Sequence, residues 1–350
     1  MWIIGCDLHT RYQQLAAMNT ATGETIERRL GHEGEQVRRF YAALEAPVRV
    51  GIEATGAVGW FEQLLGELGH ELWVGNAGAI RAAAPRRQKT DVRDARLLLE
   101  LLTEDRFPRI WLASLEERDV RQLLTHRAKL VGMRTAVCNQ LQALALGQGL
   151  RLGQRLWSRA GRSALEQLAL GERAAARRRD LLTLLEPLDA RIKELDAEVE
   201  VEARRRPDAV RLMEQSGVGP VTALAFVLVV GPVDRFRSSR QLASYLGLIP
   251  SEDSSAGRQR LGHISKQGNV MLRWLLVEAG HTAARRDPEL HRVYTRLKHR
   301  RGANIAKVAV ARKLAVRLYW ILRSSQTSAQ KVGRQGSPAT AMVGATPSHS

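Results

Sequence analysis

The sequence is poor in cysteine, in long hydrophobic runs and in acidic residues. Its 350 residues include only two cysteines, Cys6 and Cys138, and the two make neither a disulfide framework nor the paired spacing of a cysteine zinc site. A disulfide framework and a cysteine-rich zinc site are therefore excluded. We expect the protein in a reducing compartment, the cytoplasm.

The hydrophobic runs are too short for a membrane protein. The most apolar run, VTALAFVLVVG at 221–231, falls short of the about 20 apolar residues that cross a bilayer. The N-terminal segment MWIIGCDLHTR has no charged leader before its apolar residues, which is not typical of a signal peptide. We therefore expect no membrane partner.

Acidic residues are too few to balance the basic ones. Asp and Glu number 36 against 54 Lys and Arg, which gives a formal net charge of +18 and a pI near 10.9. The surplus is uneven, because residues 235–323 hold 19 Lys or Arg and five Asp or Glu, a net charge of +14. This distribution favours a polyanionic partner and predicts a nucleic-acid-binding surface in the C-terminal third.

A chain of 350 residues is long enough for two or three domains. The first part alternates strand-like and helix-like segments, which predicts a mixed α/β layered domain with an antiparallel meander followed by parallel strands. Strands are expected at 2–8, 12–20, 24–30, 48–54 and 70–76, and helices at 32–46, 59–69 and 90–103. We expect domains at 1–106, 107–205 and 206–323, and a disordered tail at 324–350 that is rich in Ser, Thr, Gly and Ala.

Residues 114–205 have a helical pattern throughout. Within it Pro187 predicts a kink or a helix start. An apolar seam predicts either a coiled-coil hairpin or dimer contact, or one helix packed on the protein's own core, and the sequence leaves both open. The seam consists of Leu181, Leu185, Leu188, Ile192, Leu195 and Val199.

The C-terminal domain is expected to be mostly α-helical. SGVGPVTALAFVLVVG at 216–231 is typical of a helix-hairpin-helix, whose glycine turn presents backbone N–H groups to a phosphate, although such turns also begin ordinary helices. Further helices are expected at 237–247, 268–284, 288–299 and 304–323, with a long polar loop between the first two.

Two aspartates stand in the segment KTDVRDA, residues 89–95, between Lys89 and Arg93. Asp91 and Asp94 are three residues apart, so a helix places both carboxylates on one face. A local explanation is available, because Asp91 can cap the helix while Asp94 lies in the favourable field of its N-terminus.

Two further acids support a different explanation. Asp7 and Glu53 each end an apolar strand, where a carboxylate is poorly solvated. If the strands are neighbours and the 90–103 helix crosses them, four carboxylates converge and repel one another. Mg²⁺ relieves that repulsion, and two such ions roughly 4 Å apart activate an attacking oxygen and stabilise a leaving one. Lys89 and Arg93 then suit a phosphate.

The motifs GCDLH, GIEATG and KTDVRDA, in this order, resemble the RuvC-like (RNase H fold) DEDD domain of insertion-sequence transposases of the IS110 type. The resemblance implies a metal-dependent catalytic domain with Mg²⁺ as its cofactor. The family's four acidic positions fall on Asp7, Glu53, Asp91 and Asp94.

A second signature of that family resembles SYLGLIPSEDSSAGRQRLGHISKQGNVMLRW, residues 244–274. The resemblance implies that Ser255 is the nucleophile, with Ser254 as the fallback because Ala256 stands where the family has glycine. A serine hydroxyl needs a base, a metal or a cationic field to attack. The candidate phosphate-binding residues of this segment are Arg258, Arg260, His263, Lys266 and, early in the next helix, Arg273. Without the resemblance, the same residues describe a Ser-rich loop with solvated charges.

The resemblance also implies partners. The DEDD domain of one subunit would face the serine domain of another in a homo-oligomer, a dimer or a tetramer on DNA. A phosphoserine ester would conserve the energy of the broken DNA phosphodiester bond during strand exchange. A bridge RNA would base-pair with target and donor DNA, while the protein contacts the nucleic-acid backbones. The basic stretches 172–179 and 285–323 are candidate RNA or DNA contacts, or solvated helix faces.

Two other functions fit parts of the sequence. A Holliday-junction-resolving nuclease would need only the four acids, so a Ser255→Ala variant would keep cutting. A non-catalytic, basic nucleic-acid-binding protein would bind equally well with Asp91→Asn and Asp94→Asn.

Overall fold

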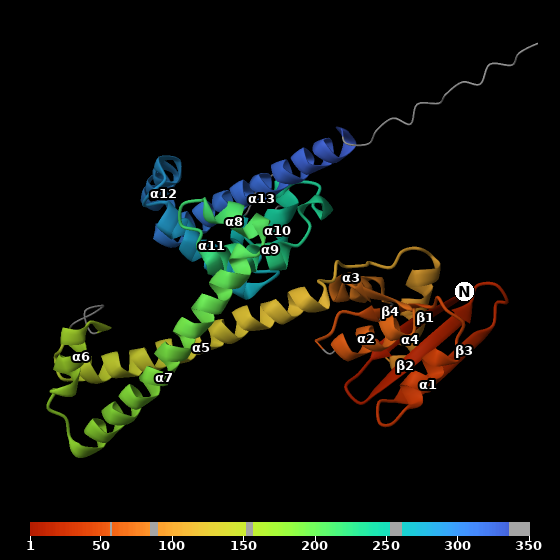
Figure 1. Ribbon diagram of the computed structural model, residues 1–350, viewed down its shortest axis with the longest axis horizontal. Helices are drawn as coiled ribbons and strands as arrows, with labels where there is room; N and C mark the ends of the chain where they lie inside the picture. The colour runs from red at the N-terminus through yellow and green to blue at the C-terminus, as the bar shows by residue number, and fades with distance from the viewer. Residues whose placement is uncertain (57, 85–89, 152–156, 253–260, 336–350) are drawn as a thin grey trace, which may run out of the picture. The chain divides into compact units, whose positions relative to one another are not determined.

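The computed structural model describes residues 1–56, 58–84, 90–151, 157–252 and 261–335 (Figure 1). The chain divides into two compact units, Met1–Leu115 and Glu116–Ser350. The first unit is a mixed α/β structure and the second is mostly helical, as the sequence predicts. The finer division at residues 106 and 205 stays a prediction.

A five-stranded sheet with the order β3-β2-β1-β4-β5 forms the centre of the first unit. β1 pairs antiparallel with β2, and β2 pairs antiparallel with β3. On its other side β1 pairs parallel with β4, and β4 pairs parallel with β5. This confirms the expected meander and parallel pairing, and the arrangement is compatible with a RuvC-like fold. The strands are Trp2–Leu8 (β1), Tyr12–Asn19 (β2), Thr25–Gly31 (β3), Arg49–Glu53 (β4) and Glu71–Gly75 (β5).

Helices cover both faces of this sheet. Successive side chains of a strand point to opposite faces, and apolar residues of β1 stand on both. Ile4 and Cys6 of β1 join a core with α1 (Gln36–Ala42) and α2 (Gly59–Glu67). On the other face Ile3 joins a core with α3 (Ala77–Ala83) and α4 (Asp91–Thr103). The sequence did not predict α3, whose small residues give no clear apolar period and whose N-terminus is capped by Asn76.

Gly5 lets α4 lie directly on β1. A Cβ atom at Gly5 would lie 2.2 Å from the Ala95 carbonyl oxygen and 2.3 Å from the Leu99 nitrogen, both of which belong to the α4 backbone. No side chain fits at that distance. The glycine therefore fixes the height of α4 above the strand that ends in Asp7 and Leu8.

The second unit begins with α5 (Leu115–Gly147), α6 (Arg159–Glu166) and α7 (Glu172–Arg204). α5 and α7 run antiparallel, since Arg127 pairs with Asp196 and Arg134 with Asp189. The seam of α7 is buried within this chain except for Leu188, which is half-buried. α7 continues through Pro187, so the helix start expected there is wrong. Whether the pair forms a coiled coil or a dimer contact stays a prediction.

Among the remaining helices, α8, α10, α11 and α13 share one core with the apolar helix α9, whose residues are almost all buried, and α12 packs on α13 instead. α13 continues to Gln335, beyond the expected end at 323, because no proline interrupts the chain before Pro338. Residues 336–350 of the expected tail lie outside the described part of the chain. The elements are α8 (Pro207–Met213), α9 (Pro220–Val230), α10 (Ser239–Tyr245), β6 (Pro250–Glu252), β7 (Leu261–Ile264), α11 (Val270–Ala283), α12 (Pro288–Arg301) and α13 (Ala303–Gln335).

In the described part of the chain, no helix is both long enough and apolar enough to cross a membrane.

Candidate metal centre and nucleic-acid interface

Two predicted acids stand where neighbouring parallel strands end. Asp7 lies near the end of β1 and Glu53 at the end of β4, one position after the paired residues Cys6 and Ile52. Gly5 and Gly51 both face α4, so the alternation of strand side chains directs Asp7 and Glu53 to the α4 face as well. The carboxyl ends of parallel strands are a common position for ligand sites.

The N-terminus of α4 approaches the same edge of the sheet. Thr90 caps the helix by accepting a hydrogen bond from the Arg93 nitrogen at 3.4 Å, and Asp91 and Asp94 occupy the first turn. Negative charge is favourable there because the helix dipole places partial positive charge at its N-terminus. The local cap that was expected at Asp91 is therefore made by Thr90 instead.

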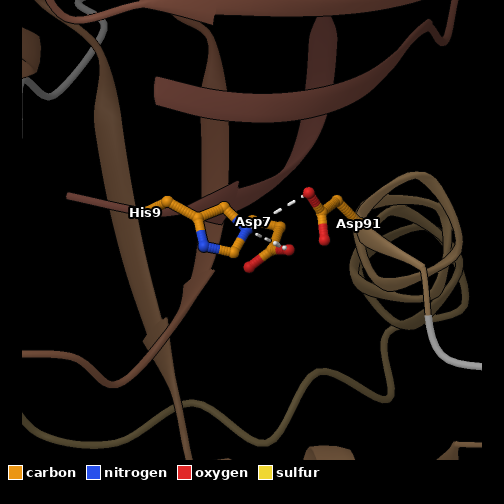
Figure 2. Close-up of side chains that lie close together, drawn as sticks. All are labelled: Asp7, His9 and Asp91. Atoms are coloured by element: carbon orange, nitrogen blue, oxygen red, sulfur yellow. Dashed lines mark hydrogen bonds and ion pairs between the residues drawn. The ribbon is translucent and has the colours of Figure 1, made fainter. Parts of the chain in front are cut away.

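Asp7, His9 and Asp91 form a compact cluster (Figure 2). The Nε2 atom of His9 lies 3.0 Å from Asp7 Oδ2 and 3.6 Å from Asp91 Oδ2. One potential ligand atom from each of the three residues lies within 4.8 Å of the other two. The strand end, the following turn and the helix N-terminus thus bring two carboxylates and one imidazole together.

Electrostatic strain is concentrated on Asp7. Burial raises the pKa of Asp7 above its ordinary value, the adjacent His9 lowers it, and the charges of Asp94 and Asp91 raise it further. The carboxylate form of Asp7 is therefore disfavoured in the folded protein unless a positive charge is near. His9 supplies part of that compensation in the structure.

Tyr12 orients Asp91 from the neighbouring strand. Its hydroxyl donates a hydrogen bond of 2.8 Å to Asp91 Oδ2, and this bond is the main cause of the raised pKa of Tyr12. The Tyr12 ring stacks on His9 with centroids 4.6 Å apart, and the Arg29 guanidinium lies 3.7 Å from the ring centroid. One tyrosine therefore contacts two members of the cluster.

The other residues predicted for this site lie around the cluster. Asp94 is close enough for its charge to act on Asp7, but among the described residues neither Asp94 nor Glu53 joins the three-residue group. Glu53 Oε1 lies 4.0 Å from an Arg81 guanidinium nitrogen instead. Arg93 is exposed on the first turn of α4, and Lys89 lies outside the described residues.

The donor set of the cluster fits a small divalent cation. Carboxylate oxygens are the preferred ligands of Mg²⁺, and a neutral imidazole nitrogen also suits Mn²⁺ and related ions. A cation would relieve the repulsion among Asp7, Asp91 and Asp94. As a metal ligand, His9 would need an unprotonated Nε2 atom. As a hydrogen-bond donor to Asp7, it would need a proton on the same atom, so the two roles exclude each other at any one time.

Sequence reasoning missed His9 and Tyr12 as members of the site. His9 was visible within the motif GCDLH, but its role depends on the turn after β1. Tyr12 reaches Asp91 across 79 positions of sequence, a contact that only the pairing of β1 with β2 and the packing of α4 create.

Comparison with known proteins gives two family matches along the chain. Residues 4–147 match a family of DEDD transposases of the IS110 type, and residues 209–295 match the family described as "Transposase IS116/IS110/IS902 family". A "Probable family 20 transposase" of Pseudomonas aeruginosa is 31% identical over 341 residues, covering 93% of this chain and 97% of that protein. The chain belongs to the IS110 family of transposases.

Two further relatives have similar names. The "Transposase for insertion sequence element IS1111A" of Coxiella burnetii is 32% identical over 68% of each chain. A "Putative transposase y4pF/y4sB" of Sinorhizobium fredii is 28% identical over 93% of this chain and 84% of its own. The protein is thus an insertion-sequence transposase, a DNA-modifying enzyme with DNA as its substrate.

The serine segment of this transposase is described only in part. Ser254, Ser255, Arg258 and Arg260 lie outside the described residues. On the strands that flank them, the β6–β7 hairpin is closed by Ser251, whose hydroxyl donates to the His263 carbonyl oxygen at 3.0 Å.

The residues that follow the β6–β7 hairpin pack closely on the end of α10, where two glycines allow the close approach and an arginine forms a hydrogen bond. A Cβ atom at Gly268 would lie 2.0 Å from the Tyr245 carbonyl oxygen, and one at Gly247 would lie 2.3 Å from the Gln267 carbonyl oxygen. Arg273 donates to the Gln267 carbonyl oxygen at 2.6 Å. Arg273 therefore has a structural contact that sequence reasoning did not foresee, while Lys266 and His263 are exposed beside it.

Proposed function

We propose that this transposase cleaves and rejoins DNA at a Mg²⁺ centre held by Asp7, Glu53, Asp91 and Asp94, with His9 as an additional ligand or hydrogen-bond donor. The cluster of Asp7, His9 and Asp91 at the carboxyl end of the sheet carries this proposal. Bound divalent cations would activate the attacking oxygen and stabilise the leaving one. Asp7 and Asp91 would hold the cation, and Tyr12 would keep Asp91 in position through its hydrogen bond.

Ser255 is the proposed nucleophile, with Ser254 as its alternative. The Ser255 Oγ–P bond forms as the bond between phosphorus and a deoxyribose oxygen breaks, and the serine proton is transferred in net terms to that leaving oxygen. The reverse step, with a different deoxyribose hydroxyl, releases the serine and joins new strands without ATP. Arg258, Arg260, His263 and Lys266 are the proposed contacts of the scissile phosphate, because cations in a serine loop stabilise charge on it.

The proposed partners are donor and target DNA, a bridge RNA and further copies of the chain. The net charge of +18, concentrated over residues 235–323, supports the nucleic-acid partners. A basic surface binds the phosphate backbone of DNA or RNA without distinguishing base sequence. Membership of the IS110 family is the ground for RNA guidance and for a site shared between subunits.

The serine step is tested with a ³²P-labelled DNA substrate and denaturing gels. The parent and the Ser251→Ala control should give a covalent protein–DNA product, because Ser251 donates its hydroxyl to the hairpin backbone. Ser255→Ala should give none, and Ser254→Ala should keep it. Cutting that persists in Ser255→Ala without a covalent product would favour a junction-resolving nuclease instead.

The metal step is tested with Asp7→Asn and a control on α4. Asp7→Asn should abolish Mg²⁺-dependent cleavage while duplex binding remains. Glu100→Gln, an exposed substitution on the same helix, should cleave like the parent. Parent protein that binds DNA but never cleaves it with Mg²⁺ or Mn²⁺ would contradict the proposal and favour a non-catalytic binding protein.

A further inference from the structure

A surface cavity of about 300 Å³ lies between α1 and α2 in the first unit, and the site described above does not use it. Its apolar lining comes from Val37, Leu64 and Trp60. The polar lining residues include Glu35, Arg38, Gln63 and Glu67. The lining therefore combines apolar side chains with charged and amide groups, so it can contact both a flat apolar face and a polar edge of a ligand.

Trp60 is the exposed aromatic residue of this cavity. It is 42% exposed, although a large indole is usually well buried. The His32 ring holds it in an edge contact with centroids 4.8 Å apart, and Phe61 lies 5.3 Å away. The indole is therefore fixed in place by protein contacts while much of its surface remains available to a ligand.

The cavity and the metal centre lie at the same end of the strands, the cavity on the face covered by α1 and α2 and the metal centre on the face covered by α4. β3 is antiparallel to β2 and so ends, at Gly31, on the edge where β1 ends. The next residue, His32, donates its backbone N–H to the Arg11 carbonyl oxygen at 2.9 Å, and its Nδ1 lies 3.3 Å from the Thr10 carbonyl oxygen. Thr10 directly follows His9, so the wall of the cavity is bonded to the turn that carries a member of the metal centre.

Charge along this edge suits a nucleic-acid strand. Arg38 offsets one of the two negative charges of the cavity, since it lies 2.7 Å from Glu67 and 4.0 Å from Glu35. Arg11 and Arg29 are exposed on the same hairpin, and neither forms an ion pair with any described residue. A phosphate backbone passing from the metal centre toward Trp60 would thus meet Arg11 and Arg29, which pair with no carboxylate of the described residues.

We propose that the Trp60 cavity binds an unpaired nucleobase of the DNA strand that is cleaved at the metal centre. A base has flat apolar faces and a polar edge, which match the indole and the Gln63, Arg38 and Glu35 side chains around it. Stacking on an aromatic side chain is tolerant of sequence, and enzymes that act on nucleic acid commonly hold an unstacked base in such a pocket. The inference rests on the proposed function, because it takes the cleaved strand as the occupant.

The test uses full-length protein and a single-stranded oligonucleotide that contains the fluorescent base 2-aminopurine, without divalent cations so that no cleavage occurs. Stacking on Trp60 should quench the probe. Trp60→Phe should retain most of the quenching, whereas Trp60→Ala should lose it and bind the single strand roughly 5- to 150-fold more weakly. Circular dichroism checks that each variant is folded.

Two controls make the result specific. Leu184→Ala removes another exposed apolar side chain, 54% exposed on α7, and should leave quenching unchanged. A fully paired duplex with the same sequence should bind parent and Trp60→Ala equally, because its bases are not available to the cavity.

Equal quenching and equal single-strand affinity in Trp60→Ala would overturn the inference. So would a Trp60→Ala variant whose sedimentation shows loss of self-association while its oligonucleotide binding is unchanged, since the surface would then contact protein. The outcome is separate from the metal proposal, because Asp7→Asn should still quench the probe even if the proposed cleavage chemistry fails.

Discussion

Tyr12 is the residue whose contact with the metal centre can be removed most cleanly. Tyr12→Phe deletes the hydroxyl that donates to Asp91 and keeps the ring that stacks on His9. Outer partners of metal ligands commonly change metal affinity about 10- to 100-fold. We therefore expect Tyr12→Phe to weaken Mn²⁺ binding by that factor, measured by titration calorimetry on the full-length protein.

Tyr294→Phe provides the matched control, because Tyr294 lies in the second unit beside His281. It should bind Mn²⁺ like the parent. Unchanged affinity in Tyr12→Phe would show that Asp91 does not need this hydrogen bond to hold a cation.

At the residue scale the sequence predicts the acidic residues of the site better than the residues that contact them. Asp7 and Asp91 are recognisable because each stands at the end or start of a strongly patterned element. His9 and Tyr12 act through a turn and a strand register, which local patterns do not reveal. Glu53 ends its strand as predicted, yet its carboxylate lies near Arg81 rather than in the three-residue group, because the direction of an exposed side chain depends on its neighbours.

At the scale of elements, the packing of α4 on β1 positions the metal centre. Gly5→Ala places a Cβ atom against the α4 backbone, and overpacking of this kind costs about 1–3 kcal/mol or more. We expect urea unfolding to show that loss, and cleavage to fall because Asp91 moves away from Asp7.

Gly66→Ala separates this contact from a general effect of glycine replacement. A Cβ atom at Gly66 would meet nothing within 4 Å, and the residue is exposed in α2. Alanine should therefore stabilise the helix by about 0.5–1 kcal/mol. Equal stability of Gly5→Ala and the parent would contradict the close contact of α4 with β1.

Asp287 joins α12 to α13 in a way that depends on pH. It caps α12 through the Leu290 nitrogen and lies 2.6 Å from an Arg317 guanidinium nitrogen. Chiefly because of Arg317, the pKa of Asp287 lies below its ordinary value of 3.8. The folded protein favours the charged form of Asp287. The charge therefore stabilises the folded state at pH values above the ordinary pKa, and this stabilisation is lost as the pH falls through the lowered pKa of the folded protein.

Asp287→Asn keeps a side chain that caps helices well and removes the charge. We expect it to cost about 1 kcal/mol near neutral pH, and the difference from the parent should shrink as pH falls below 3.8. Urea unfolding across this range measures both. A difference that stays constant down to the acid limit would contradict the role of the charge.

The elements of the first unit were largely predictable because their signals are local. The expected strands at 2–8 and 48–54 lie within a residue of β1 and β4 at each end, since apolar runs between turn residues specify them. α3 was not predictable, because its small residues carry little periodicity. Residues 324–335 are polar and were expected to be disordered, but they belong to α13. They contain no proline, so nothing in them ends a helix whose earlier residues pack on the core.

At the scale of the whole molecule, the excess of positive charge predicts salt-dependent binding to DNA. Each phosphate contact contributes a slope of about −0.9 to log K against log salt. Arg296, Arg300 and Arg301 are exposed on α12 and form no ion pair with described residues. Replacing all three with Gln should reduce the slope by up to about 2.7, measured by fluorescence anisotropy with a duplex of arbitrary sequence.

Arg191→Gln with Arg204→Gln is the corresponding control, because these arginines already pair with Glu194 and Glu200. It should change the slope little. An unchanged slope in the α12 variant would place the DNA-binding surface elsewhere.

The central claim is that Asp7 and Asp91 hold a divalent cation at the carboxyl end of the sheet. An anomalous difference map from crystals of the protein grown with Mn²⁺ tests it most directly. The account predicts a peak within coordination distance of both Asp7 and Asp91, and its loss in Asp7→Asn. A map with full density for both side chains and no peak between them would contradict the account.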